Sequence, residues 1–150
     1  MEASSLKRLF LKDYPNVFAA FEGELHGTHL KYDTGKAGKD DITSWSHSED
    51  WVSWHFRASE AGEFRVEITY AAESRSAGGS FTVSVANQQL SADVEPTGGA
   101  YEFQSFELGT IRIAVPGEYS LTCKPDRILG EALMNLKEVR FEAIPQGAQL

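Results

Sequence analysis

The chain has 150 residues, of which 41% are hydrophobic and 24% charged, and a formal net charge of −8 at pH 7. This length and composition predict one globular domain with a core large enough to fold without disulfides. The negative charge argues against nucleic acid as a partner, because phosphate binding needs clustered Lys and Arg. It also disfavours anionic polysaccharides, unless a local basic patch overrides the mean charge.

The sequence contains neither a membrane segment nor a recognisable signal peptide. No apolar run approaches the length of a membrane helix, so we expect no membrane partner. The N-terminus lacks the apolar region and cleavage site of a signal peptide. The localisation therefore stays open between an intracellular protein and a piece of a longer secreted or periplasmic chain.

The single cysteine, Cys123, alternates with Tyr119 and Leu121 and is expected to be a buried apolar residue.

Residues 1–12 are predicted to form a short helix. Apolar residues recur there at helical spacing, and serines near the start can act as the N-cap. Turn chemistry follows the segment. We interpret residues 1–16 as a linker or short helix that precedes a β-sandwich domain over residues 17–150.

The rest of the chain alternates between apolar and polar residues, as half-buried β-strands do. From Val52 to Arg57, for example, Val52, Trp54 and Phe56 share one face. The predicted strands cover residues 17–32, 51–57, 64–70, 81–85, 90–94, 106–115, 119–123 and 134–144. The spacing slips at Gly109, which predicts a β-bulge, and residues 33–44 are a predicted loop. About eight or nine strands separated by short turns are typical of an antiparallel β-sandwich, and we expect an all-β jelly roll.

The apolar faces of these strands define the predicted core. Its members are Trp54, Phe56, Phe64, Val66, Ile68, Phe81, Val83, Ile113 and Leu121. Four aromatic residues stand apart, in loops or on polar faces: Tyr32, Trp45, Trp51 and Tyr101. Such rings can stack on the apolar face of a sugar while polar neighbours bind its hydroxyl groups. Each ring can equally cover an edge of the sandwich, since singly exposed aromatics are common.

No constellation of residues indicates catalysis. His26 and His29 are three residues apart in a predicted strand, which places them on opposite faces, and a zinc site needs a third close ligand. The acid pairs at residues 40–41 and 49–50 are typical of solvated turns, and no catalytic triad, phosphate loop or dinucleotide motif is present. We expect a protein that is not an enzyme and has no catalytic residues, metal or cofactor.

A family resemblance runs through these segments in order. The segments from Asp50 to Phe56 and from Ala61 to Ala71 resemble two successive strands of galactose-binding-like β-sandwiches, which include the carbohydrate-binding modules of families 6 and 35. Further similar segments follow at 97–101, 108–111, 116–121 and 134–139. The last of these, together with residues 42–45, resembles the sandwich appended to bacterial α-L-fucosidases and sulfatases. The resemblance covers residues 17–145.

The resemblance implies a binding site in loops at one end of the sandwich. In family 6 modules an aromatic precedes the first of these strands, another follows a Thr-Gly-Gly turn, and an Asn precedes the last strand. By position these fall on Trp45, Tyr101 (or Phe103) and Asn135. We expect these residues to converge on one surface, with Glu73 and Arg75 as flanking polar contacts; the list of predicted site residues is Trp45, Tyr101, Asn135, Glu73 and Arg75.

The resemblance also bears on calcium. The structural calcium site of the family uses acids in the first strand, which Glu22 and Glu24 could match, and an Asp in the last strand. Lys137 stands at the position of that Asp. Because an ammonium group cannot replace an oxygen ligand, we expect no calcium site of this kind.

The predicted function is that of a non-catalytic carbohydrate-binding module. It would bind a neutral glycan through loop aromatics and target an associated glycan-active enzyme. Its partners would be an oligo- or polysaccharide and a glycosidase or sulfatase catalytic domain. The alternative is a structural sandwich that packs against such a catalytic domain without binding sugar. An exposed ring pair in a loop groove favours the first function, and a broad apolar face favours the second.

Overall fold

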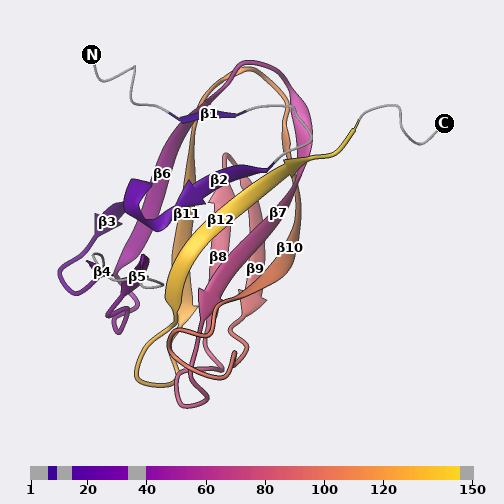
Figure 1. The fold of residues 1–150 in the computed structure, drawn as a ribbon. Helices are drawn as coiled ribbons and strands as arrows, with labels where there is room; N and C mark the ends of the chain where they lie inside the picture. Colours follow the sequence, from indigo (N-terminus) through magenta and orange to yellow (C-terminus); the bar gives the residue numbers. More distant parts are fainter. Residues whose placement is uncertain (1–6, 10–14, 34–39, 146–150) are drawn as a thin grey trace.

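The structure, a computed structural model, describes residues 7–9, 15–33 and 40–145. Two sheets pack face to face in this part of the chain and enclose the core between them (Figure 1). The predicted all-β sandwich is confirmed. No helix among the described residues is long and apolar enough to cross a membrane.

The first sheet has the strand order β1-β6-β11-β8-β9, and β3 also pairs with β6. Its strands are β1 (Lys7–Leu9), β3 (Glu24–His26), β6 (Trp51–Ala58), β8 (Ser80–Val85), β9 (Gln88–Asp93) and β11 (Gly117–Arg127). β11 occupies one edge of β6, so β1 and β3 share its other edge, at residues 56–58 and 51–53. This sharing brings the loop after β3 next to the loop before β6.

The second sheet has the strand order β10-β7-β12-β5-β4, and β2 also pairs with β12. Its strands are β2 (Asn16–Ala19), β4 (Lys31–Asp33), β5 (Asp41–Thr43), β7 (Gly62–Ala71), β10 (Gln104–Ile113) and β12 (Asn135–Ala143), and a 3-10 turn, Ala20–Glu22, follows β2. The pairing of β10 with β7 slips between Glu107 and Gly109, whose φ is 144°. The bulge predicted at Gly109 is therefore confirmed.

The core joins both sheets through aromatic contacts. Each of the nine predicted core residues is at most 2% exposed, so that prediction is confirmed. The ring of Phe18 lies 5.4 Å from that of Phe56 in one sheet and 4.9 Å from that of Phe141 in the other. Cys123 is buried, as the alternation predicted.

Two predicted elements differ from the structure. Lys7–Leu9 form a strand parallel to β6, so the helix predicted for residues 1–12 is wrong there; its other residues, 1–6 and 10–12, lie outside the described part. Asp41–Thr43 form β5 inside the segment predicted as a loop. Both strands have only three residues, which is too short for an alternating pattern to be recognised. The domain boundary between residues 16 and 17 stays a prediction.

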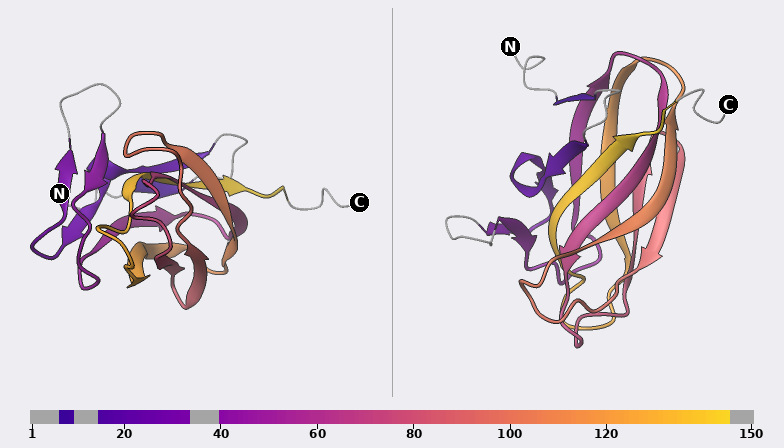
Figure 2. Two further views of the ribbon diagram at one scale, coloured as in Figure 1. Left: turned by 90° about the horizontal axis from the view of Figure 1, so that it is seen from below. Right: turned by 45° about the vertical axis from the view of Figure 1, so that its right-hand side comes forward.

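Several loops gather at one end of the sandwich. β7 ends there and β12 begins there, and the chain between β9 and β10 passes beside them (Figure 2). β1 and the end of β12 lie toward the opposite end. Loops held by the ends of long strands are where a rigid scaffold presents binding groups.

Candidate functional site

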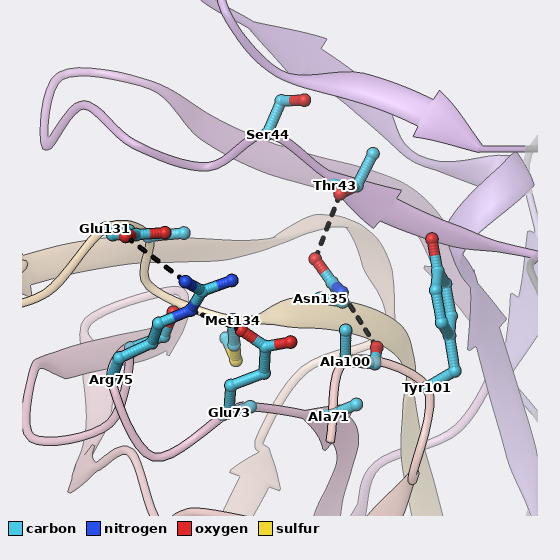
Figure 3. A pocket seen from close by; sticks show the side chains of 13 residues that line it. Thr43, Ser44, Ala71, Glu73, Arg75, Ala100, Tyr101, Glu131, Met134 and Asn135 are labelled. Carbon is cyan, nitrogen blue, oxygen red and sulfur yellow. Dashed lines mark hydrogen bonds and ion pairs between the residues drawn. The ribbon is translucent and has the colours of Figure 1, made fainter.

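A pocket of about 330 Å³ lies at this loop-rich end (Figure 3). Its walls come from the end of β5, the chain after β7, the loop before β10 and the segment that leads into β12. Tyr101 stands at one side, Glu73, Arg75 and Glu131 gather at the other, and Asn135 lies between them. A concave surface with one ring and several polar groups is typical of a small-molecule site.

Four of the five predicted site residues line this pocket: Tyr101, Asn135, Glu73 and Arg75. They come from three different segments, and no local pattern links them. Whether they bind a sugar remains a prediction. β7 pairs with β12, with Asn135 opposite Ala71, and with β10, with Gln104 opposite Tyr70, and these two pairings bring the three segments to one place.

Asn135 holds the pocket together. Its Nδ2 donates a hydrogen bond to the carbonyl of Ala100 (2.8 Å), and its Oδ1 accepts one from the Thr43 hydroxyl (3.0 Å). The amide thereby ties β12 to β5 and to the loop that carries Tyr101. Each end of the amide keeps one further hydrogen-bonding position, so Asn135 can still contact a ligand.

Tyr101 presents the exposed ring of the pocket. Its side chain is 44% exposed, and its hydroxyl donates to Asp33 at 3.2 Å. Phe103 packs against it edge-on, with ring centroids 6.4 Å apart. Desolvation and the hydrogen bond to Asp33 raise the pKa of Tyr101, and the hydrogen bond restrains the ring. The ring is thus both accessible and fixed.

Arg75 lies between two carboxylates on the other side of the pocket. Its Nε donates to Glu73 at 2.8 Å, and its Nη1 lies 3.6 Å from Glu131. These acids raise the pKa of Arg75, with the Glu73 hydrogen bond contributing most. The group carries two negative charges and one positive charge and offers both donors and acceptors.

The prediction that Trp45 lies on the binding surface is wrong. Its side chain is 0% exposed, and its indole Nε1 donates to the carbonyl of Asp50 at 2.9 Å. The preceding residue, Ser44, has φ 62°, in the left-handed region, which interrupts any alternation between β5 and the next loop. Trp45 therefore packs in the core and positions the loop before β6, where no ligand can stack on it.

Sequence reasoning missed several residues of the pocket. Thr43 lies in the segment predicted as a loop, and Glu131 lies in the loop before β12. Glu131 had no signal in the sequence beyond being a charged loop residue. Thr43 could have been found only from the position of β5, a three-residue strand.

The acids considered for calcium have other partners. Glu22 accepts from the backbone of Ala19 at 3.0 Å and pairs with Lys7 at 3.1 Å. Glu24 lies 3.4 Å from the His55 ring. The ammonium of Lys137 lies 5.0 Å from the centroid of the Phe103 ring. A different group, His29, His47 and Asp50, does offer ligand atoms within a distance that one metal ion could span.

The outer face of β6 carries Trp51, His55 and Arg57. The His26 ring stacks on Trp51 at 3.8 Å, and Lys124 Nζ lies 4.4 Å from the centroid of the Trp51 ring. Further along, Arg57 pairs with Glu118 at 2.6 Å. Side chains of neighbouring strands thus contact this face, although His55 stays exposed.

The chain belongs to the family described as Domain of unknown function (DUF5077), whose sequence profile matches residues 28–143. No curated protein matches the chain.

Several solved structures share the fold at low sequence identity. A family 6 carbohydrate-binding module of Cellvibrio mixtus lichenase 5A, in complex with cellotriose, is 18% identical with a TM-score of 0.65, over 86% of this chain and 97% of the module. The Podospora anserina β-(1,4)-mannanase GH26-CBM35 is 17% identical with a TM-score of 0.68, over 91% of this chain and 29% of the mannanase. The Cry4Aa toxin of Bacillus thuringiensis is 16% identical with a TM-score of 0.73, over 94% of this chain and 25% of the toxin. The chain thus has the galactose-binding-like fold of family 6 and family 35 modules and spans only about a quarter of the mannanase and the toxin.

Proposed function

We propose that the chain is a non-catalytic carbohydrate-binding module whose pocket beside Tyr101 holds a neutral glycan. The observation that carries this proposal is the exposed, fixed ring of Tyr101 over a pocket that contains an amide, an arginine and carboxylates. A ring for stacking and polar groups for hydroxyls are what sugar recognition requires. The fold shared with modules of families 6 and 35 supports the same function.

The charges of the pocket favour a neutral glycan over an anionic one. Glu73 and Glu131 outnumber Arg75, and the whole chain has a net charge of −8. One stacked ring contributes roughly 1–3 kcal/mol by analogy with base–aromatic stacking. We therefore expect dissociation constants in the micromolar to millimolar range.

Calorimetric titration with neutral oligosaccharides tests the proposal. Cellotriose and short β-1,4-mannan oligomers are suitable probes, since one structure with this fold is a complex with cellotriose and another belongs to a β-(1,4)-mannanase. Tyr101→Ala should weaken binding about tenfold or more, because the stacking surface is lost. Tyr101→Phe keeps the ring and should stay within a few-fold of the wild type.

Phe21→Ala is the matched control. Phe21 is an aromatic residue that is 67% exposed and does not line the pocket, so its loss should leave glycan binding unchanged. The proposal fails if Tyr101→Ala folds and binds like the wild type.

The alternative, a sandwich that only docks on a glycosidase or sulfatase domain, receives less support. The large exposed apolar side chains of the described residues, Phe21, Tyr101, Val115 and Leu129, lie on four separate segments. This distribution does not make the broad apolar face that docking favours. A wild-type chain that binds no glycan at millimolar concentrations, but binds a catalytic domain, would establish the alternative.

A further inference from the structure

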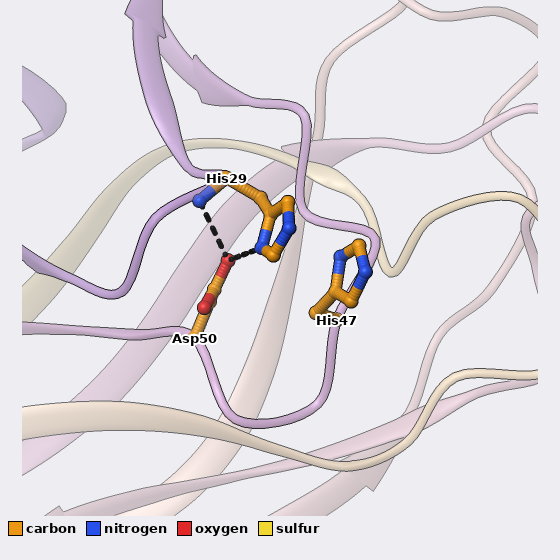
Figure 4. Close-up of side chains that lie close together, drawn as sticks. All are labelled: His29, His47 and Asp50. Atoms are coloured by element: carbon orange, nitrogen blue, oxygen red, sulfur yellow. Dashed lines mark hydrogen bonds and ion pairs between the residues drawn. The ribbon is translucent and has the colours of Figure 1, made fainter.

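A second group of polar side chains lies outside the Tyr101 pocket. His29 belongs to the loop between β3 and β4, and His47 and Asp50 belong to the loop between β5 and β6 (Figure 4). The two loops meet because β3 pairs with the start of β6, with His26 opposite Trp51. One atom from each of the three side chains lies within 4.8 Å of those of the others.

Asp50 is a buried carboxylate with one oxygen poorly satisfied. Its side chain is 1% exposed. Oδ2 accepts from the backbone N–H of His29 at 3.2 Å and lies 3.1 Å from His29 Nδ1, whereas Oδ1 has no hydrogen-bond partner among the described residues. A buried carboxylate is costly unless positive charge lies beside it. The cluster therefore favours a cation next to Asp50.

The two imidazole rings lie beside this carboxylate. The rings of His29 and His47 stack with centroids 3.5 Å apart and planes 10° from parallel, and their nitrogens lie within 4.8 Å of each other and of a carboxylate oxygen. A single metal cation between the ring nitrogens and the carboxylate satisfies all three groups at once.

We propose that His29, His47 and Asp50 form a binding site for Zn²⁺. Two imidazoles and a carboxylate are a common zinc ligand set, with distances of about 2.0–2.2 Å to the metal. Calcium and magnesium prefer all-oxygen sites, so imidazoles select against them. His47 also lines a hollow of about 490 Å³ with Glu49, Asp126 and Arg127, which leaves room for water to complete the coordination.

The fold holds Asp50 in place. The Trp45 indole donates to the Asp50 carbonyl, and the Asp50 N–H donates to the carbonyl of His47 at 3.1 Å. Gly27 has φ 126°, and a Cβ at this position would lie 2.0 Å from Asp50 Oδ1, so only glycine admits the carboxylate.

His47 is the adjustable ligand. Its ring is exposed, hydrogen-bonds Ser46 at 3.0 Å and stacks on His29. To ligate, the ring turns out of the stack about its side-chain bonds, while the backbone stays in place.

This proposal departs from the expectation of no metal. In the sequence, the neighbour of His29 is His26, and that residue instead contacts Trp51 and the Ser53 hydroxyl, the latter at 2.8 Å. The second and third ligands come from a loop that the sequence does not connect to His29. The inference is also independent of glycan binding, because its test uses the metal alone.

Calorimetric titration of the tag-free protein with Zn²⁺ tests the site. We expect one equivalent to bind with a dissociation constant in the micromolar range or below, and His47→Ala and His29→Ala to weaken binding about tenfold or more. Zn²⁺ at about one hundred times the dissociation constant should raise the melting midpoint of the wild type by roughly 5–10 °C. A visible absorption band of tetrahedral Co²⁺ should appear with the wild type and disappear with His47→Ala.

The other two histidines provide matched controls, since the chain has four histidines in total. His26→Ala and His55→Ala should bind Zn²⁺ within a few-fold of the wild type. His47 is exposed, so its substitution should not disturb folding, and circular dichroism checks this. The proposed Zn²⁺ site would be wrong if the wild type showed no saturable Zn²⁺ binding. It would also be wrong if all four histidine variants lost Zn²⁺ affinity equally.

Discussion

At the scale of single residues, Trp45 shows how a backbone angle decides the role of a side chain. The left-handed φ of Ser44 turns the chain so that the next residue points into the core. The Trp45 carbonyl then accepts from Leu133 N–H at 2.7 Å, and its indole reaches Asp50. An aromatic residue in a loop is therefore part of the scaffold.

This structural role of Trp45 predicts a separation of stability from binding. Trp45→Phe should lower the free energy of unfolding by about 1–3 kcal/mol, because a smaller ring leaves space in the core and the Asp50 carbonyl loses its donor. Glycan affinity should stay within about threefold, since the ring does not reach the pocket. Urea unfolding and calorimetry measure the two quantities. Unchanged stability with lost binding would contradict this role.

Cys123 allows a test of burial at one atom. Complete burial, and to a lesser degree Asp126, raises the pKa of the Cys123 thiol far above its usual range. A raised pKa keeps the thiol protonated at every pH below it, so the reactive thiolate is absent near neutral pH. We expect no reaction with a thiol reagent at pH 8 in the native protein and one equivalent in denaturant. Rapid labelling of the native protein would show that β11 opens.

At the scale of elements, one amide links three segments. Asn135 joins β12 to β5 through Thr43 and to the Tyr101 loop through Ala100. Asn135→Ala should lower the free energy of unfolding by about 1–3 kcal/mol, because the carbonyl of Ala100 loses its donor. It should also weaken glycan binding by releasing Tyr101. Thr43→Val removes only the hydrogen bond between Thr43 and Asn135, so it should lower both stability and glycan affinity less than Asn135→Ala does. Equal effects of the two substitutions would mean that the hydrogen bond to Ala100 contributes nothing.

The elements also show what the sequence allowed us to predict. Long strands such as β6, β7 and β12 were predictable, because their alternating residues record burial on one face. Tyr101 and Asn135 were assigned to one site through resemblance to a family. Trp45 was misplaced because the same resemblance carries no information on the φ of Ser44. The meeting of His29 with His47 and Asp50 depends on β3 pairing with β6, a long-range contact that no local pattern encodes.

The positions compared with the calcium site of family 6 modules lie in the 3-10 turn, β3 and β12. Glu22 pairs with Lys7, Glu24 lies beside His55, and Lys137 replaces the expected acid. Millimolar Ca²⁺ should therefore shift the melting midpoint by less than about 1 °C, since only a ligand that binds the folded state raises it. Zn²⁺, tested in parallel, should raise the midpoint. A clear rise with Ca²⁺ would show that a calcium site survives despite Lys137.

At the scale of the whole molecule, both candidate sites lie on loops supported by one rigid core. The Tyr101 pocket draws on the ends of β5, β7 and β12, and the histidine cluster draws on the loop between β3 and β4 and the loop between β5 and β6. The strands of the sandwich fix these loops, and the strand end at Asn135 also contributes to the pocket. Substitutions away from the two sites can therefore change the stability of the sandwich without changing the affinity of either site.

The stability contributed by β1 shows whether the domain begins before residue 17. Residues 7–9 precede the predicted boundary at 16 and 17, yet they pair in parallel with β6, and Leu9 is 4% exposed. Burying a leucine contributes about 1.5–3 kcal/mol, and the backbone hydrogen bonds of the strand add to this. Removal of residues 1–9 should therefore leave a folded sandwich that is less stable by roughly 2–4 kcal/mol in urea unfolding. Leu9→Ala in the full chain should account for about 2 kcal/mol, and Arg8→Ala, at an exposed position of the same strand, should change stability by less than about 0.5 kcal/mol. If the deletion and Leu9→Ala both leave stability unchanged, residues 1–9 do not belong to the domain, which then begins at β2.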